Sequence, residues 1–250
     1  MSVLTKVDSL RSGRTPFVLA TVVRAERPTS AKPGDRAVVM PDGTMEGFVG
    51  GSCAESTVRS QGMRLLATGE STLLRITPTE TSETVTEGLV TVGNPCLSGG
   101  TLEIFLEAMF PPKLVCVHGD GPVARALLDV GRALGHDLCA PADPLPDDLA
   151  ALVVASHGHG EEPLLENALR AGVPYIGLVA SRRRGAAVVA SLNVDDEQRT
   201  RVHTPAGLDI GARTPAEIAL SIYAQLVAER AGAGTSRSAA PAETTGHCCA

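Results

Sequence analysis

The pattern of apolar and polar positions changes near the middle of the chain, and the change predicts two domains. The first part has the pattern of several strands with one helix among them. Apolar and alternating runs predict strands at 17–26, 71–77 and 99–110 and a hairpin over 36–50 that turns at Asp42-Gly43, and the polar stretch 78–88 is predicted to be a loop. The first part therefore has the pattern of a mixed α+β domain.

The helix of this first part is predicted to begin at Ser52. From that residue onward the apolar positions follow helical spacing. Ser52 and Glu55 have the S-x-x-E spacing of a capping box. In a capping box the serine side chain accepts a hydrogen bond from the backbone N–H of the glutamate, and the glutamate side chain accepts one from the backbone N–H of the serine. The pattern therefore predicts Ser52 as the N-cap residue.

After Pro111-Pro112 the pattern becomes an alternation of short strands and helices. The strands are predicted within 113–118, 136–143, 151–156 and 173–181, and the helices over 122–135, 161–172, 182–192 and 214–230. The last helix has Thr214 at the N-cap, Pro215 at N1 and Glu217 at N3. This alternation predicts an α/β, Rossmann-like domain with a doubly wound parallel sheet. The predicted domains are 1–110 and 111–231, with a small, polar and disordered tail over 232–250.

Composition and charge narrow the functional classes. Hydrophobic residues make up 43% of the 250 residues, which is ample for two cores, whereas aromatic residues make up 2% and the net charge is -6. Nucleic-acid binding needs a basic face or stacking platforms, so it is not expected. The chain has no apolar run of about 18 residues, and charges break its first 20 residues, so neither a membrane span nor a signal peptide is expected. We expect a cytoplasmic protein.

Two cysteines lie in settings that favour a reactive thiol. Cys53 follows Gly50 and Gly51 at the predicted helix start, where the helix dipole and open N–H groups stabilise a thiolate and the glycines leave room for a partner. Cys96 lies in a similar glycine-containing segment. The alternative interpretation is that these are small residues that fill gaps.

The other four cysteines are not expected to take part in a site. Cys116 and Cys139 lie inside predicted strands and are expected to be inert core residues, and Cys248 and Cys249 lie in the tail. The spacings match no C-x-x-C zinc pattern, and thiols stay reduced in the cytoplasm. A disulfide framework is therefore not expected.

A glycine turn opens the second domain. Gly119-x-Gly121-x-x-Ala124 follows a predicted strand and begins a helix, the context in which such a turn binds a phosphate group. Asp143 lies 22 residues after Gly121, close to the offset of about 20 residues expected for an acid that binds a ribose. The alternative is that the turn only packs a helix tightly on a strand.

Histidines and arginines follow the next two strands. His157 and His159 come directly after one strand, at the carboxyl edge where α/β sheets bind ligands. Ser181 and the three arginines 182–184 enter a helix after the next strand and suit an anionic ligand or an acidic protein surface. The alternatives are a solvated helix face for the arginines and, for the histidines, one helix cap and one solvated ring. The histidine pair alone is incomplete as a metal site.

These segments, taken together, resemble the XdhC/CoxI family. Residues 19–58 resemble its N-terminal domain, with a proline-glycine loop, a DG hairpin and a G-G-S-C-A-E helix start, and 94–107 resemble its second cysteine segment. Its C-terminal Rossmann domain is matched by "VHGDGPVARAL", "SHGHGEE", "YIGLVASRRR" and "GLDIGARTPAEIALSIYAQLVAER". The resemblance runs from about Thr15 to Arg230.

The resemblance implies an accessory factor for molybdenum hydroxylases of the xanthine or carbon monoxide dehydrogenase type. Such factors bind the molybdenum cofactor, hold it during sulfuration and deliver it, so the protein is expected to be a cofactor chaperone more than an enzyme. The implied partners are the hydroxylase apoenzyme, a cysteine desulfurase and further copies of the chain. The implied cofactor-binding residues are Gly50, Gly51, Cys53, Glu55, Cys96, Gly119, Gly121, Asp143, His157, His159, Ser181, Arg182 and Arg183, with Cys53 as the contact to molybdenum or sulfur.

Two alternatives from other functional classes remain at this stage. The first is an NAD(P)-dependent oxidoreductase, which rests on the glycine turn and Asp143 and would need one of the two histidines as acid or base. The second is a protein scaffold in which the cysteines are structural. Binding of a nicotinamide cofactor or of a metal cofactor distinguishes the three hypotheses.

Overall fold

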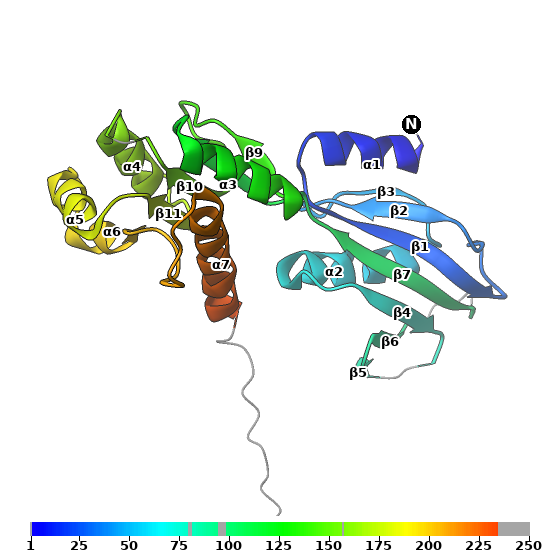
Figure 1. Ribbon diagram of the computed structural model, residues 1–250. Coiled ribbons are helices and arrows are strands. Elements are labelled where there is room, and N and C mark those ends of the chain that lie inside the picture. Colours follow the sequence, from blue (N-terminus) through cyan, green and yellow to red (C-terminus); the bar gives the residue numbers. More distant parts are fainter. Residues whose placement is uncertain (1, 80–81, 95–98, 157, 235–250) are drawn as a thin grey trace, which may run out of the picture. The chain divides into compact units, whose positions relative to one another are not determined.

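The computed structural model describes residues 2–79, 82–94, 99–156 and 158–234, the side chains of 230–234 aside. The chain divides into two compact units, Met1–Pro111 and Pro112–Ala250, and each is described here by itself (Figure 1).

Unit 1 is built on a mixed seven-stranded sheet with the order β3-β2-β1-β7-β4-β6-β5. Its helices are α1 (Val3–Ser12) and α2 (Ser52–Thr68), and its strands are β1 (Phe17–Glu26), β2 (Arg36–Val39), β3 (Met45–Gly47), β4 (Thr72–Thr77), β5 (Thr84–Thr86), β6 (Leu89–Gly93) and β7 (Thr101–Met109). Strands β4 and β6 run parallel, and the other neighbouring pairs are antiparallel.

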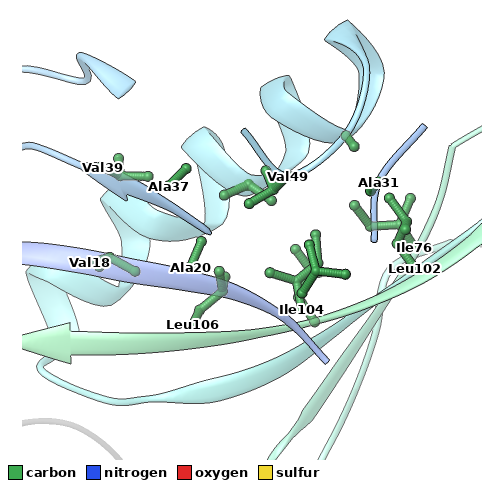
Figure 2. Close-up of a cluster of buried hydrophobic side chains, with 14 of the residues drawn as sticks. Val18, Ala20, Ala31, Ala37, Val39, Val49, Ile76, Leu102, Ile104 and Leu106 are labelled. Atoms are coloured by element: carbon green, nitrogen blue, oxygen red, sulfur yellow. The ribbon is translucent and has the colours of Figure 1, made fainter. Parts of the chain in front are cut away.

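The two faces of this sheet are covered by different helices. Alternate residues of a strand point to opposite faces, and in β1 Val18 and Ala20 point into the core under α2, whereas Phe17 belongs to the smaller core under α1. Figure 2 shows the core between α2 and the sheet, where side chains from β1, β2 and β7 meet. This core fixes α2, and with it Cys53, against the sheet.

Two predictions for unit 1 are wrong. Gly51, not Ser52, is the N-cap of α2, and no side chain caps this helix. Glu55 pairs with Arg59 one turn further along instead of returning to the helix start, so the predicted capping box does not form. The predicted loop 78–88 contains β5, an exposed edge strand. Its three residues, Thr84, Val85 and Thr86, are all exposed, so no buried alternation marks it in the sequence.

Unit 2 is built on an all-parallel five-stranded sheet with the order β12-β11-β10-β8-β9. Its strands are β8 (Leu114–His118), β9 (Asp137–Cys139), β10 (Leu149–Val154), β11 (Tyr175–Leu178) and β12 (Val202–His203), and its helices are α3 (Pro122–Ala133), α4 (Glu161–Arg170), α5 (Arg182–Ser191), α6 (Asp196–Thr200) and α7 (Pro215–Gly234).

Helices cover both faces of this sheet. Residues of α3 and α7 form one core with Val115 and Val153, and residues of α4 and α5 form another with Leu152 and Val154. The mixed sheet of unit 1 and this doubly covered parallel sheet confirm the predicted fold class. The predicted cap of α7 is also confirmed, since Thr214 Oγ1 accepts a hydrogen bond from the Glu217 amide and Glu217 accepts one from the Thr214 amide. Helices α1 and α6 and strands β6 and β12 were not predicted.

Cys116 and Cys139 form a disulfide, which corrects the prediction of two inert thiols. The two residues are direct partners in the register of β8 and β9, with their Cα atoms 4.5 Å apart. That separation lies within the usual range for a disulfide. The sequence showed both residues in strands, but not that these strands are neighbours in this register. Cys248 and Cys249 lie outside the described residues.

Candidate functional site

The thiol of Cys53 lies at the second position of α2, half-buried. Gly51 precedes the helix with φ -69° and ψ 178°, and no side chain caps the first turn. Gly50 has a φ of +137°, a conformation that favours glycine, and a Cβ there would lie 3.0 Å from the Ala54 Cβ. The start of α2 therefore combines a thiol with a helix N-terminus that has no side-chain cap.

Asn94 connects the segment after β6 to this helix end. Its Nδ2 donates to the Cys53 carbonyl at 3.0 Å and to Thr57 Oγ1 at 3.1 Å, and Thr57 Oγ1 itself donates to the Cys53 carbonyl at 3.0 Å. Cys96 lies two residues further along the chain, outside the described residues. Asn94 was not among the predicted site residues, although its position in the "NPC" segment could have indicated it.

In unit 2 the predicted glycine turn lies where the direction of strand order reverses. From β8 the chain moves to β9 on one side and then to β10 on the other, and ligands of such sheets bind at the carboxyl ends of the strands at this point. Gly119 has a φ of +128°, and a Cβ there would lie 2.3 Å from the Ala155 carbonyl oxygen. Glycine at 119 therefore serves the close packing of the segment after β8 against the segment after β10.

The histidine loop is held by hydrogen bonds within the same edge of the sheet. His159 Nδ1 lies 3.0 Å from the Ser156 carbonyl oxygen, and His118 Nε2 lies 2.9 Å from the His159 carbonyl oxygen. His159 is exposed, and its Nδ1 faces its own loop. His157 lies outside the described residues. His118 was not predicted, although it ends β8 next to the glycine turn.

The buried carboxylate of Glu161 holds the histidine loop in place through hydrogen bonds. Its side chain is 1% exposed, and it accepts hydrogen bonds from the Ser156 hydroxyl at 2.9 Å and the Gly158 amide at 2.8 Å. It also forms an ion pair with Arg184 of α5. Glu161 was not among the predicted site residues, because an acid at a helix start usually lies in solvent.

The arginine segment borders a cavity of unit 2. Ser181 caps α5, its Oγ accepting from the Arg184 amide at 3.3 Å, and Arg182 is 86% exposed with a nitrogen 3.6 Å from Asp209 Oδ2. Arg183 is also exposed. Ser181, Arg182 and Arg184 line a cavity of about 740 Å³ together with residues 205–212. Residues 205–212 were not among the predicted site residues.

Asp143 lines a second cavity of about 380 Å³ with His118 and Gly160. The structure thus brings Asp143, His118 and the histidine loop to one edge of the parallel sheet. Gly50, Gly51, Cys53 and Glu55 belong to unit 1.

The described residues contain no group of three or more His, Cys, Asp or Glu side chains arranged to hold a metal ion. Within the same ranges, no helix is both long and apolar enough to cross a membrane.

Comparison with known sequences identifies the family. The model of the XdhC and CoxI family matches residues 10–77, and the model of the XdhC Rossmann domain matches 115–226. The chain belongs to the XdhC/CoxI family. Its resemblance to this family is thereby confirmed over both units.

Relatives of this XdhC/CoxI-family chain are distant. It is 25% identical to an uncharacterized Escherichia coli K12 protein, YqeB, over 278 aligned positions that cover 99% of this chain and 50% of YqeB, so the chain spans half the length of that relative. It is 22% identical to the molybdenum cofactor insertion chaperone PaoD of the same organism, over 90% of this chain and 86% of PaoD. A crystal structure of a xanthine dehydrogenase from Bacillus halodurans has a TM-score of 0.44 at 17% identity and covers 96% of this chain and 98% of its own.

Proposed function

We propose that this protein is a maturation factor that binds the molybdenum cofactor, holds it while its terminal sulfur is installed, and delivers it to a molybdenum hydroxylase of the xanthine or carbon monoxide dehydrogenase type. Family membership and the distant similarity to PaoD support this proposal. In it the chain holds and transfers a cofactor rather than turning over a substrate. We also keep the expectation that it acts in the cytoplasm, which rests on the sequence alone.

The observation that carries the proposal is the thiol of Cys53 at the start of α2. A helix N-terminus favours the thiolate over the thiol, because the dipole and the N–H groups stabilise negative charge. A thiolate is a soft donor and suits a thiophilic metal or its sulfur ligand. Gly51, two residues before Cys53, borders open space, since a Cβ there would meet no atom within 4 Å. These residues fit the role of holding the metal end of the cofactor.

The neighbours of Cys53 take supporting roles in the proposal. Gly51 allows a ligand to approach the backbone, Gly50 supplies the turn before it through its positive φ, and Cys96 supplies a second thiol. Glu55 pairs with Arg59, so its carboxylate is directed along the helix and does not occupy the amides of the first turn. Asn94 holds the first turn through the Cys53 carbonyl.

Independently of Cys53, we propose the arginine edge of unit 2 as a surface that binds the phosphate group of the cofactor. Ser181, Arg182 and Arg183 stand at the start of α5, where both the guanidinium groups and the helix dipole favour an anion. The adjoining cavity of about 740 Å³ has the size of ordinary ligand sites. We propose that His157 and His159, which follow the neighbouring strand β10, also contact the ligand. Bound cofactor supplies the metal and its labile sulfur, and this chain supplies the contacts that retain it.

The proposed partners follow from the same role. The apoenzyme of the client hydroxylase receives the cofactor, and a cysteine desulfurase supplies sulfur to it. We further propose that copies of the chain associate with one another.

The test compares Cys53→Ala and Cys53→Ser with the unchanged protein, each purified from cells that make the cofactor. We expect both variants to keep their fold, measured by circular dichroism, and to lose most of the bound molybdenum and pterin, measured by elemental analysis and pterin fluorescence. Ser56→Ala, an exposed position on the same helix, serves as the control and should retain the cofactor. Full retention by both Cys53 variants, with unchanged activation of the client enzyme, would refute the role of this thiol.

A further inference from the structure

One side chain of α7 holds the segment 205–212, which lines the cavity of about 740 Å³. Gln225 Oε1 accepts a hydrogen bond from the Gly207 amide at 2.7 Å. The amides on either side, those of Ala206 and Leu208, donate to backbone carbonyl groups. The position of the cavity wall at Gly207 therefore depends on how the Gln225 side chain is oriented.

The contacts of Gln225 determine that orientation. A backbone N–H can only donate, so the atom next to the Gly207 amide is the side-chain oxygen, which also accepts from the Tyr175 hydroxyl at 2.9 Å. Gln225 Nε2, which can only donate, then lies 3.2 Å from His203 Nδ1. His203 Nδ1 must accept, so the neutral ring carries its hydrogen on Nε2, 3.1 Å from Glu229 Oε2.

The surroundings of His203 support this arrangement. Burial, together with the negative charge of Glu229, raises the pKa of the Tyr175 hydroxyl, so this group stays protonated and donates. The Tyr175 ring stacks on the His203 ring with centroids 4.9 Å apart. On the side of α6, Arg199 and Arg201 donate to backbone carbonyl groups. Glu229 is the ionised group in contact with the His203 ring.

Protonation of His203 is incompatible with this set of hydrogen bonds. Histidine is the side chain that ordinarily changes its charge between about pH 5 and pH 8. The added proton occupies Nδ1, while Nε2–H stays on Glu229. Nδ1–H then faces the NH₂ group of Gln225, and two donors cannot bond to each other. The amide must turn its oxygen toward His203, and the Gly207 amide then loses its acceptor.

We propose that Gln225 and His203 are positioning residues of this cavity, which hold Gly207 on α7 while His203 is neutral and release it when His203 is protonated. Ser181 and Arg182 line the same cavity, so acid changes the surface that they border. The inference concerns the chain itself and does not depend on which ligand the cavity takes. It therefore goes beyond the proposed cofactor function.

The test is NMR spectroscopy of the isotope-labelled full chain between about pH 8 and pH 5. We expect the ring nitrogen shifts of neutral His203 to be those of the Nε2–H tautomer. The Gly207 amide resonance should shift with the same midpoint as the His203 ring. Hydrogen exchange of this amide, corrected for the intrinsic rate at each pH, should become roughly fivefold to tenfold faster below the midpoint, as expected for loss of one hydrogen bond.

Two substitutions should abolish the acid response for different reasons. In Gln225→Glu the carboxylate can accept from the Gly207 amide and from a protonated His203 ring at the same time, so Gly207 should stay bonded in acid. In His203→Asn the side-chain oxygen can replace the accepting Nδ1 and does not titrate. His136→Asn is the matched control, because it removes a histidine ring that stacks on Tyr223 in the same unit, and it should keep the acid response of Gly207.

Three results would each overturn the proposal. The first is a neutral His203 ring that carries its hydrogen on Nδ1. The second is a Gly207 resonance that does not follow the titration of His203. The third is an acid response in Gln225→Glu equal to that of the unchanged protein. The experiment uses no cofactor, so its outcome and the outcome of the Cys53 test are separate results.

Discussion

Among single residues, Glu161 has an unusual environment for a carboxylate, because its side chain is almost fully buried. A buried carboxylate is costly unless its charge is paired and its oxygens are hydrogen-bonded. Glu161 meets both conditions through the Arg184 guanidinium, the Ser156 hydroxyl and the Gly158 amide. Since Ser156 and Gly158 belong to the histidine loop and Arg184 belongs to α5, this one side chain joins two segments at the carboxyl edge of the sheet.

Replacing Glu161 with Gln should therefore destabilise unit 2. The amide keeps the shape of the carboxylate but leaves Arg184 without its counter-charge. We expect a loss of about 2–3 kcal/mol in the free energy of unfolding, less than for a fully buried pair because Arg184 is 37% exposed. Urea titration measures this change. Glu162→Gln, at the neighbouring and more exposed position, is the control, and an equal effect of both substitutions would contradict the prediction.

At the scale of elements, the cap of α7 gives a prediction for acid. Glu217 accepts hydrogen bonds from the backbone amides of Thr214 and Arg213, and these bonds lower the pKa of its carboxyl below the ordinary value of 4.5. A carboxyl with a lowered pKa in the folded state stabilises the fold above its unfolded pKa and loses that contribution as the pH falls through the folded pKa. The unfolded state binds the proton first, so acid favours unfolding here.

Glu217→Gln should make the stability less sensitive to acid. Below about pH 4.5, the free energy of unfolding of the variant should fall less steeply than that of the unchanged protein, because one linked proton is removed. Urea titrations at a series of pH values measure the two slopes. Glu70→Gln, an exposed position in unit 1, is the comparison. Identical slopes for Glu217→Gln and the unchanged protein would show that this cap does not contribute to acid sensitivity.

The two predicted caps show what local sequence can and cannot determine about an element. Ser52 with Glu55 and Thr214 with Glu217 have the same spacing, yet only the second pair forms a capping box. At α7, Pro215 holds the first helical position and marks the start, whereas at α2 Gly51 takes the N-cap position and Arg59 is available to Glu55. The helix itself was predictable from apolar spacing, but the partner of each polar side chain was not.

The same limit applies to the short elements that the sequence analysis missed. Strand β12 has two residues, and β5 is wholly exposed. Elements of this kind carry too few buried positions for a period to be recognised. They form because a neighbouring strand offers unpaired backbone groups. The sequence of the segment itself does not show which strand will be its neighbour.

For the whole molecule, the two-part pattern and the glycine turn could be predicted because each depends on residues that are close together in the sequence. The contact between Glu161 and Arg184, the cavity lined by residues 205–212 and the pairing of Cys116 with Cys139 could not. Each depends on which distant segments become neighbours. The candidate site was thus predicted as a set of loops at one sheet edge, and its hydrogen-bonded framework became visible only in the structure.

The disulfide gives a prediction about how stability is distributed over the molecule. Each core described above draws its residues from one unit only, and the bond joins β8 to β9 within unit 2. A cross-link across 23 residues stabilises by about 3 kcal/mol in the chain-entropy account. Cys139→Ser should therefore speed hydrogen exchange of the amides in β8, β10 and β11.

The same substitution should leave the amides of β1 and β7 nearly unchanged, since their side chains pack in the cores of unit 1. Hydrogen exchange followed by mass spectrometry compares the two sheets in one sample. The unchanged protein with added reductant should reproduce the pattern, because it loses the same bond without a substitution. Equal acceleration in both sheets would mean that the two units open together, and no acceleration in either would mean that the bond does not contribute to the stability of the parallel sheet.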